Sequence, residues 1–353
     1  MNARSENRFI RLNFITIIVT LLVILAGGIV RSTGSGMGCP DWPKCFDQYI
    51  PPTSVSELPE NYKDKYVEGR LKKNERFAKY LESMGKFELA KEIRNDQSIT
   101  LPEEFNVAKT WTEYINRLAG AVLGLFLLLT TVASFAFRKT ATRIVLLSFL
   151  NLVVVAYQAW LGSVVVSTNL TQWVVTVHML LALVILAITI YTYNYAKQLY
   201  KEPTQIMYRI SWLKGFLAFT ILLTTLQIIL GAEVRETIDA IAKSSQFLNR
   251  PTWVSKVGDM FVYHRDLAIL LTISNVIVYK MVIDRFNGKG WPLLTANLIA
   301  IVLMMQVVTG LVLSYFGLPA FAQPLHILFS FLLFSLQYYL YLLVYRTSTY
   351  QSN

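Results

Sequence analysis

Long apolar segments alternate with short polar connections along most of the chain. Eight of these segments reach or approach the length of about 20 apolar residues that a helix needs to cross a bilayer core. They cover residues 12–30, 111–137, 144–166, 173–195, 212–232, 261–283, 293–316 and 325–345. The pattern therefore predicts an all-α membrane protein with eight transmembrane helices.

The first segment follows three arginines, as the apolar core of a secretory signal peptide would. It is long for a signal peptide, and no clear small-residue cleavage site follows it, so we expect a retained helix. Composition agrees with insertion in a lipid bilayer, because 54% of the residues are hydrophobic. Only 16% are charged, against roughly 25% in ordinary soluble domains.

Lysine and arginine are distributed unevenly between the two sides. If the N-terminus is cytoplasmic, the outer connections 167–172 and 317–323 contain neither residue. The inner connections and the C-terminal end contain Arg138, Lys139, Arg143, Lys197, Lys201, Arg209, Lys280, Arg285, Lys289 and Arg346. The positive-inside rule then places both termini in the cytoplasm. It also explains the net charge of +11 without nucleic acid as a partner.

One long polar segment, residues 33–110, separates the first two predicted spans on the outer side. Within it, apolar residues at helical spacing predict one or two short amphipathic helices that cap the outer surface. These residues are Phe77, Tyr80, Leu81, Met84 and Phe87. The alternative is a solvated spacer with no specific role.

The only two cysteines, Cys39 and Cys45, lie in this outer segment. The outer side of a bacterial membrane is oxidising, so a disulfide between them is permitted. A metal site is less favoured, because no histidine lies nearby in the sequence.

The sequence contains an internal repeat. Pairs of residues 148 positions apart include Asn116 and His264, Gln158 and Gln306, Gly162 and Gly310, and His178 and His326. The first and fifth spans match at an offset of 204, which aligns Arg31 with Arg235. Each half has four spans, so both point the same way across the membrane, as in a parallel duplication. We predict two pseudo-symmetric four-helix bundles, residues 1–200 and 201–353.

The chain has only three histidines, His178, His264 and His326, and all three lie at the outer ends of predicted spans. Ionisable residues in a bilayer are costly and are usually functional. Two imidazoles facing each other across a bundle match the ligand set of a six-coordinate haem, and His264 with His326 could form such a pair. We favour haem over structural histidines. We also favour it over a non-haem metal, since no carboxylate cluster accompanies them.

The N-terminal half departs from the repeat at two positions. Asn116 aligns with His264, and Glu113 aligns with Phe261 (261 − 148 = 113). The first half therefore combines one histidine, His178, with a carboxylate, whereas the second combines two histidines with an aromatic ring. This difference predicts a reactive N-terminal site and an electron-relay site in the C-terminal half.

The spacing of Glu113, Asn116, Arg117 and Gly120 places them on one helix face. Gly120 would let a flat macrocycle approach the helix backbone closely. An interfacial Glu113 that pairs with Arg117 or Lys109 is the alternative.

Four arginines lie at the outer membrane surface in matched pairs, namely Arg31, Arg117, Arg235 and Arg265. Arginine on the outer side runs against the charge bias of the topology. We therefore expect these side chains to bind haem propionates through bidentate hydrogen bonds. Simple snorkelling to the interface is the alternative.

Three features together resemble the haem A synthase family over essentially all eight spans. They are the run GGIVRSTGSGMGCPDWP at residues 27–43, the run EYINR at residues 113–117, and the three histidines with the His264-Arg265-Asp266-Leu267 run. The resemblance implies an inner-membrane oxidoreductase that acts on a CH3 group, oxidising the ring-8 methyl of haem O to the formyl of haem A.

The resemblance also implies roles for individual residues. Haem O would be the substrate in the N-terminal half, with its iron on His178, and haem b would be a cofactor on His264 and His326. Glu113 would be catalytic. The pair of cysteines in the outer segment would be redox-active. A haem O synthase, cytochrome oxidase assembly factors and a second copy of the chain are candidate partners.

One departure from the family pattern concerns Asn116, which stands where a fourth haem-facing histidine is expected. A single ligand from His178 would leave an axial position of the substrate haem open, which oxidation of a methyl group requires. Two other classes of function stay open. A membrane cytochrome that only carries electrons would more naturally keep two histidines in both halves. A transporter of parallel repeats would more naturally show Gly/Pro-interrupted spans.

Overall fold

The computed structural model describes residues 3–100, 104–201, 205–206, 211–246, 248–286 and 290–349. Within these ranges, eight helices are long and apolar enough to cross a membrane. They are α1 (Ala3–Ser32), α4 (Val107–Ser134), α5 (Thr142–Ser167), α6 (Gln172–Gln198), α7 (Ser211–Ser244), α8 (Asp259–Phe286), α9 (Gly290–Tyr315) and α10 (Ala322–Tyr345). The prediction of an all-α protein with eight spans is confirmed.

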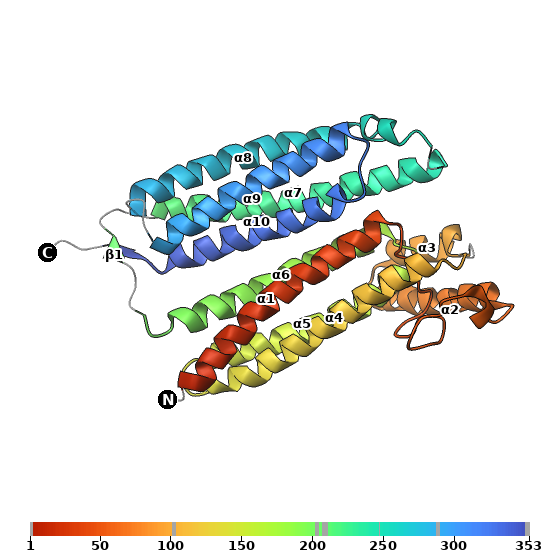
Figure 1. Ribbon diagram of the computed structural model, residues 1–353, viewed down its shortest axis with the longest axis horizontal. Helices are drawn as coiled ribbons and strands as arrows, with labels where there is room; N and C mark the ends of the chain where they lie inside the picture. Colours follow the sequence, from red (N-terminus) through yellow and green to blue (C-terminus); the bar gives the residue numbers. More distant parts are fainter. Residues whose placement is uncertain are drawn as a thin grey trace.

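The eight helices form two bundles that lie side by side (Figure 1). In the first, α1, α4, α5 and α6 pack in a ring, and in the second α7, α8, α9 and α10 pack in the same order. This common order agrees with a duplication. The symmetry is only approximate, because α10 packs against α1 more extensively than α6 packs against α7. We retain the division at residues 200 and 201 as an interpretation.

The two bundles approach each other most closely where α1 crosses α10. A Cβ added at Gly28 of α1 would lie 3.0 Å from Cα of Pro324 in α10. Any side chain larger than hydrogen would therefore collide with the α10 backbone. Glycine at this position allows the two halves to pack together.

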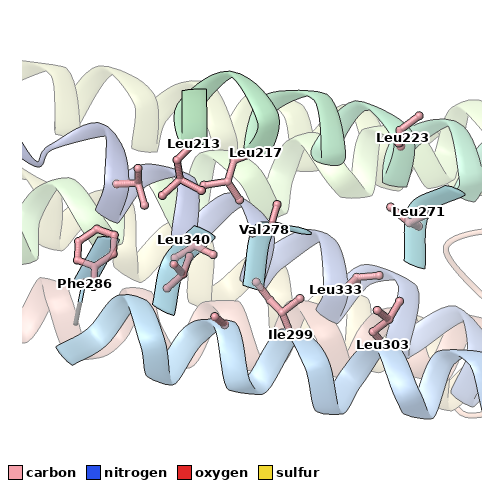
Figure 2. Close-up of a cluster of buried hydrophobic side chains, with 13 residues drawn as sticks. Leu213, Leu217, Leu223, Leu271, Val278, Phe286, Ile299, Leu303, Leu333 and Leu340 are labelled. Atoms are coloured by element: carbon pink, nitrogen blue, oxygen red, sulfur yellow. The ribbon is translucent and has the colours of Figure 1, made fainter. Parts of the chain in front are cut away.

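The C-terminal bundle has an apolar core, beside which the buried polar side chains of Thr224, Asn275 and Gln337 hydrogen-bond to one another. Leu217, Val278, Ile299 and Leu340 are buried there, one from each helix of the bundle (Figure 2). The opposite faces of the helices carry exposed apolar side chains, as expected for contact with lipid. Burial of this core positions the outer ends of α8 and α10.

The polar outer segment folds into a cap on the first bundle. It contains α2 (Tyr62–Ser83) and α3 (Phe87–Asn95), flanked by the short 3₁₀ turns η1 (Val55–Glu57) and η2 (Gln97–Thr100). Phe77 and Ile93 pack against Leu161 of α5 and Val174 of α6. The predicted amphipathic helices are present and cap one end of the bundle, so the segment is not a solvated spacer. At 22 residues, however, α2 is longer than the short helices expected.

A second, smaller cap covers the C-terminal bundle. It is formed by the end of α7, which extends beyond its apolar segment, and by the 3₁₀ turns η4 (Arg250–Thr252) and η5 (Val254–Lys256). Val234 and Ile238 of α7 pack there against Trp253 and Leu318. Both caps lie at the same end of the bundles, which we term the outer end (Figure 1).

The start of α1 and the end of α10 both lie at the opposite, inner end (Figure 1). There the two-residue strand β1 (Gln205–Ile206) pairs in parallel with β2 (Ser348–Thr349), and the 3₁₀ turn η3 (Phe135–Phe137) follows α4. Two of the basic residues used for the topology, Arg209 and Lys289, lie outside the described residues.

Candidate functional site

His264 of α8 and His326 of α10 face each other near the outer end of the C-terminal bundle. Their ring centroids are 6.4 Å apart and the ring planes are inclined by 64°. A metal–imidazole bond is about 2 Å long and the ring centroid lies about 1 Å behind the nitrogen, so two rings on one iron have centroids about 6 Å apart. The observed separation therefore suits a single iron between the two side chains.

Each histidine ring lies against a glycine of a neighbouring helix. A Cβ added at the glycine would approach the ring Cε1 within 3.4 Å at Gly162 and His178, 3.1 Å at Gly231 and His264, and 3.2 Å at Gly310 and His326. Two of these pairs are repeat equivalents, so the two halves place their histidines in the same way. The position equivalent to Gly231 in the first half is Gly27, where an added Cβ would meet nothing within 4 Å. The repeat pointed to Gly162 and Gly310 as matched positions, but only the structure gives them this role.

Amide and hydroxyl groups contact the two histidines of the second bundle. Gln306 Nε2 lies 3.2 Å from His326 Nε2, and Thr309 Oγ1 lies 3.0 Å from His326 Nδ1. Gln227 Nε2 lies 3.1 Å from His264 Nδ1 and donates to the His264 carbonyl at 2.9 Å. These contacts fix the orientation of both rings. Of these residues, sequence reasoning marked only Gln306, as a repeat position, while Gln227 and Thr309 were missed.

The first bundle presents a different set of groups at the equivalent level. Gln158 Nε2 donates to the carbonyl of His178 at 2.9 Å. Nδ1 of His178 and Oδ1 of Asn116 are buried, and neither has a hydrogen-bond partner among the described residues. Buried polar atoms without partners usually mark a bound group or water. The first bundle thus offers one imidazole and one amide where the second offers two imidazoles.

Glu113 is buried, and both of its carboxylate oxygens have partners. Oε2 accepts a hydrogen bond from the backbone N–H of Cys39 at 2.7 Å, and Oε1 accepts one from Arg117. The predicted pairing of Glu113 with Arg117 is therefore present. The contact with Cys39 was not predicted, since it joins residues 74 positions apart.

Cys39 and Cys45 form a disulfide, which confirms that prediction. The loop that they close is fastened to the outer end of α4. Arg117 donates to the carbonyls of Cys39 at 2.8 Å and Lys44 at 2.9 Å, and Thr110 Oγ1 donates to that of Gly38 at 2.8 Å. Gly38 is required here, because an added Cβ would lie 2.5 Å from backbone atoms of α4.

The cap adds positive charge beside this loop. Burial lowers the pKa of Lys73 in α2; the carboxylate of Asp41 opposes this shift, and the nearby charges of Arg117 and Arg76 add to it. On the other side of the loop, the pKa of the Asp47 carboxyl is lowered, chiefly by a hydrogen bond from Lys65. The loop therefore has a half-buried lysine of α2 and the Lys65–Asp47 ion pair as its charged neighbours.

The four arginines proposed from the sequence lie in three different settings. Arg117 binds the disulfide loop, as described above. Arg31 and Arg235 converge on one carboxylate, Asp239, at 3.4 and 2.8 Å, across the junction of the two bundles. Arg235 also donates to Gln323, three residues before His326. Arg265 is 57% exposed and pairs with its neighbour Asp266.

Asp239 was missed in the sequence. Its spacing from Arg235 is that of an i, i+4 ion pair, which is a signal for that contact alone. Its contact with Arg31 depends on how the two bundles pack.

The fold and these side chains define a class of protein: a polytopic helical membrane protein of two similar bundles, with two facing imidazoles in one and a single buried imidazole in the other. A family model described as cytochrome oxidase assembly protein matches residues 10–82 and 81–338. The chain belongs to this family.

Relatives named heme A synthase match most of the chain. One from Shouchella clausii is 23% identical over 349 residues, which cover 95% of this chain and 97% of the relative. One from Wolbachia pipientis wMel is 24% identical over 349 residues, covering 92% and 89%. One from Shewanella oneidensis is 28% identical over 166 residues, covering 47% and 39%. These matches confirm the family resemblance inferred from the motifs.

Proposed function

We propose that this protein is a haem A synthase, an oxidoreductase that converts the ring-8 methyl of haem O to the formyl of haem A. The observation that carries the proposal is the difference between its two bundles. One has two facing imidazoles, and the other has a single imidazole with Asn116 at the equivalent of the second. A difference of this kind suits one haem that carries electrons and one that reacts, in a chain whose relatives are named heme A synthase.

The C-terminal bundle would hold haem b between His264 and His326. The 6.4 Å separation of the ring centroids supports two bonds to one iron. Gln227 and Thr309 contact Nδ1 of the two rings, and the Gln306 amide, 3.2 Å from His326 Nε2, would have to turn away when that nitrogen binds iron. A six-coordinate haem of this kind supplies one-electron transfer when bound.

The N-terminal bundle would hold haem O through His178, whose buried Nδ1 has no other partner among the described residues. Asn116 offers only an amide, which is a poor ligand for haem iron, so His178 would be the one strong protein ligand of the substrate haem. When bound, this haem would supply the oxidising chemistry at its methyl group. His178 and Asn116 hold and orient the ring.

Glu113 is the catalytic residue in this proposal. Conversion of a methyl to a formyl group passes through an alcohol and removes four electrons from the carbon, which an external oxidant must accept, and protons are lost as it proceeds. A carboxylate near the ring edge can accept them or stabilise positive charge on the methyl carbon. Its bonds to Cys39 and Arg117 would hold one carboxylate orientation in place. The same bonds support the alternative that Glu113 only fastens the disulfide loop.

Haem propionates are the proposed ligands of Arg31, Arg117, Arg235 and Arg265. Asp239 would compete for two of these side chains, since it accepts hydrogen bonds from Arg31 and Arg235. Binding of a propionate there would replace one carboxylate by another. Arg265, which is exposed, could turn from Asp266 at little cost.

The proposal also places the chain in the inner (plasma) membrane with both termini cytoplasmic. The cap of α2 and α3 and the disulfide would then lie in the oxidising outer compartment. A redox role for Cys39 and Cys45 would require that their replacement lowers turnover more than stability. A haem O synthase, cytochrome oxidase assembly factors and a second copy of this chain are the proposed protein partners.

Co-expression with a haem O synthase, in a host that makes no haem A, tests the function. Haems extracted from the purified chain should include haem b together with haem A or its alcohol intermediate. The second candidate is a membrane cytochrome that only carries electrons, which the His264–His326 pair alone would permit. Recovery of haem b with unaltered haem O, from a folded chain with a normal low-spin spectrum, would favour that carrier and reject the synthase.

A further inference from the structure

The inner part of the N-terminal bundle contains a layer of buried polar side chains that the proposed chemistry does not use. Hydrogen bonds within this layer join neighbouring helices all around the bundle. On α1, Asn13 donates to Thr192 of α6 at 2.9 Å, and Thr16 contacts Thr130 of α4 at 3.0 Å. Thr131 of α4 donates to the Ser148 carbonyl of α5 at 3.0 Å. Asn151 of α5 donates to Thr189 of α6 at 2.9 Å, which completes the ring.

Three polar atoms in the layer lack hydrogen-bond partners among the described residues. They are Oδ1 of Asn13, Oγ of Ser148 and Oδ1 of Asn151. The three residues are 0%, 5% and 2% exposed, so bulk solvent does not reach them. No water is available from a bilayer core either, and an unpaired polar atom there is strongly unfavourable. Hydrogen-bond partners for these three atoms must therefore lie inside the bundle.

The repeat shows that the fold itself does not require these polar groups. At the equivalent positions of the C-terminal bundle, Asn13 is replaced by Leu217 (offset 204), Ser148 by Ala296 and Asn151 by Ile299 (offset 148). These three residues are buried in the apolar core of that bundle, in the region that Figure 2 draws. The C-terminal bundle keeps other buried polar side chains, but Thr224, Asn275 and Gln337 hydrogen-bond to one another and none of them has an unpaired atom among the described residues. The two halves thus differ in unpaired polar atoms at these three positions.

Apolar side chains close the polar layer on both sides. About one helical turn toward the inner end, Phe9, Phe137 and Ile144 pack together and are fully buried. Toward the outer end, Leu127 and Ile185 form another apolar cluster with their neighbours. The layer is therefore enclosed, and it is separated from the level of the histidines.

We propose that this layer, formed by Asn13, Ser148, Asn151 and the threonines around them, binds a small cluster of buried water molecules. Internal water typically occupies sites where two to four polar groups converge and would otherwise stay unpaired. Unpaired oxygens on α1 and α5 and the ring of threonine hydroxyls meet this condition. Water there would complete hydrogen bonding between helices of a membrane bundle, which direct contacts leave incomplete.

This inference does not depend on the proposed haem chemistry. Thr189 lies 11 residues from His178 along α6 (189 − 178), which corresponds to about 16 Å at the helical rise of about 1.5 Å per residue. The cluster between Leu127 and Ile185 keeps the two levels apart. Loss of the water cluster and loss of haem synthesis can therefore be measured separately.

Electron cryomicroscopy of the full chain in lipid nanodiscs, at a resolution that shows ordered water, provides the direct test. Density peaks should lie within hydrogen-bonding distance of Asn13 Oδ1, Ser148 Oγ and Asn151 Oδ1. The equivalent region around Leu217, Ala296 and Ile299 serves as the internal control and should show none. A polar layer without peaks, in a map that shows water at other buried sites, would overturn the proposal.

Hydroxyl-radical labelling gives a second, independent measurement. Brief X-ray irradiation makes radicals from bound water, and these label adjacent side chains. Peptides from residues 144–155 of α5 should be labelled several-fold more than peptides from the equivalent residues 292–303 of α9. The triple variant Asn13→Leu, Ser148→Ala, Asn151→Ile, built from the residues of the other half, should lose this excess.

The control variant Leu146→Ala, at a 65% exposed position of α5, should keep the labelling excess. Equal labelling of the α5 and α9 peptides in the unaltered chain would contradict the proposal. An excess that persists in the triple variant would contradict it as well. If the triple variant does not fold, the comparison between the two peptides in the unaltered chain still decides.

Discussion

Replacement of Gly231 by alanine should displace His264 without unfolding the C-terminal bundle. The added Cβ would lie 3.1 Å from Cε1, 3.7 Å from Nδ1 and 3.9 Å from Nε2 of the ring. Carbon atoms in favourable contact are about 3.5–4.0 Å apart, so the ring must withdraw by about half an ångström. Overpacking of this kind costs about 1–3 kcal/mol, and the higher helix propensity of alanine offsets about 1 kcal/mol.

A displacement of this size matters only if the ring is bonded to something that cannot follow it. In the proposed site, the bond from His264 to the haem iron is about 2 Å long and strongly directional. The withdrawn ring must tilt or lengthen that bond. We therefore expect Gly231→Ala to keep nearly all of its haem b but to show shifted electron paramagnetic resonance g values and an altered midpoint potential.

The matched control is Gly27→Ala, the repeat-equivalent substitution in the other bundle. Its Cβ would meet nothing within 4 Å, and Asn116 takes the place of the histidine, so the low-spin spectrum should not change. Two results would refute the reasoning: wild-type g values and potential in Gly231→Ala, or an equal change in Gly27→Ala. The first would mean that the glycine does not set the ring position, and the second that the effect is not local.

Three further predictions concern the remaining site residues. Changing His264 or His326 to alanine should remove the low-spin haem signal while the chain stays in the membrane, and normal spectra from both single variants would exclude this ligand pair. Glu113→Gln should bind haem in both halves but form haem A about 10²–10⁴-fold more slowly; lower protein yield with normal output per mole of folded chain would leave Glu113 a purely structural role. Alkylation of freshly quenched cells should detect no free thiol at Cys39 or Cys45, and two reactive thiols would contradict the disulfide.

The spans could be predicted from the sequence because a bilayer restricts which backbone structures can cross it. Every backbone group in the core of a membrane must be paired within its own helix, so long apolar segments have one stable solution. The repeat then gave the relation between the bundles, since Gln158, Gly162 and His178 recur at one constant offset. The length of α2 was underestimated, because a helix that packs on other helices through only part of its surface shows a weak periodic pattern.

The immediate surroundings of the site residues could not be predicted in the same way. Glu113 is held by a backbone N–H of Cys39, and every residue has a backbone N–H, so no residue type signals the contact. Arg31 meets Asp239 only because α1 and α7 lie on either side of the junction between the bundles. Contacts of this kind depend on the tertiary fold, so the spacing of residues in the sequence does not predict them.

Because the two halves share one fold, side chains that differ between equivalent positions point to a difference in function. Equivalent residues of the two bundles have similar backbone positions and similar burial. If only folding stability mattered, similar side chains would be expected at the two equivalent positions. At the level of the histidines, the chain keeps Gly162 and Gly310 but replaces a histidine by Asn116. In the inner layer it keeps Thr16 and Thr220 but exchanges Asn151 for Ile299. Since the second bundle has the same fold with apolar residues at the positions of Asn13, Ser148 and Asn151, these three polar groups are not needed for the fold. They are best explained by what that bundle binds.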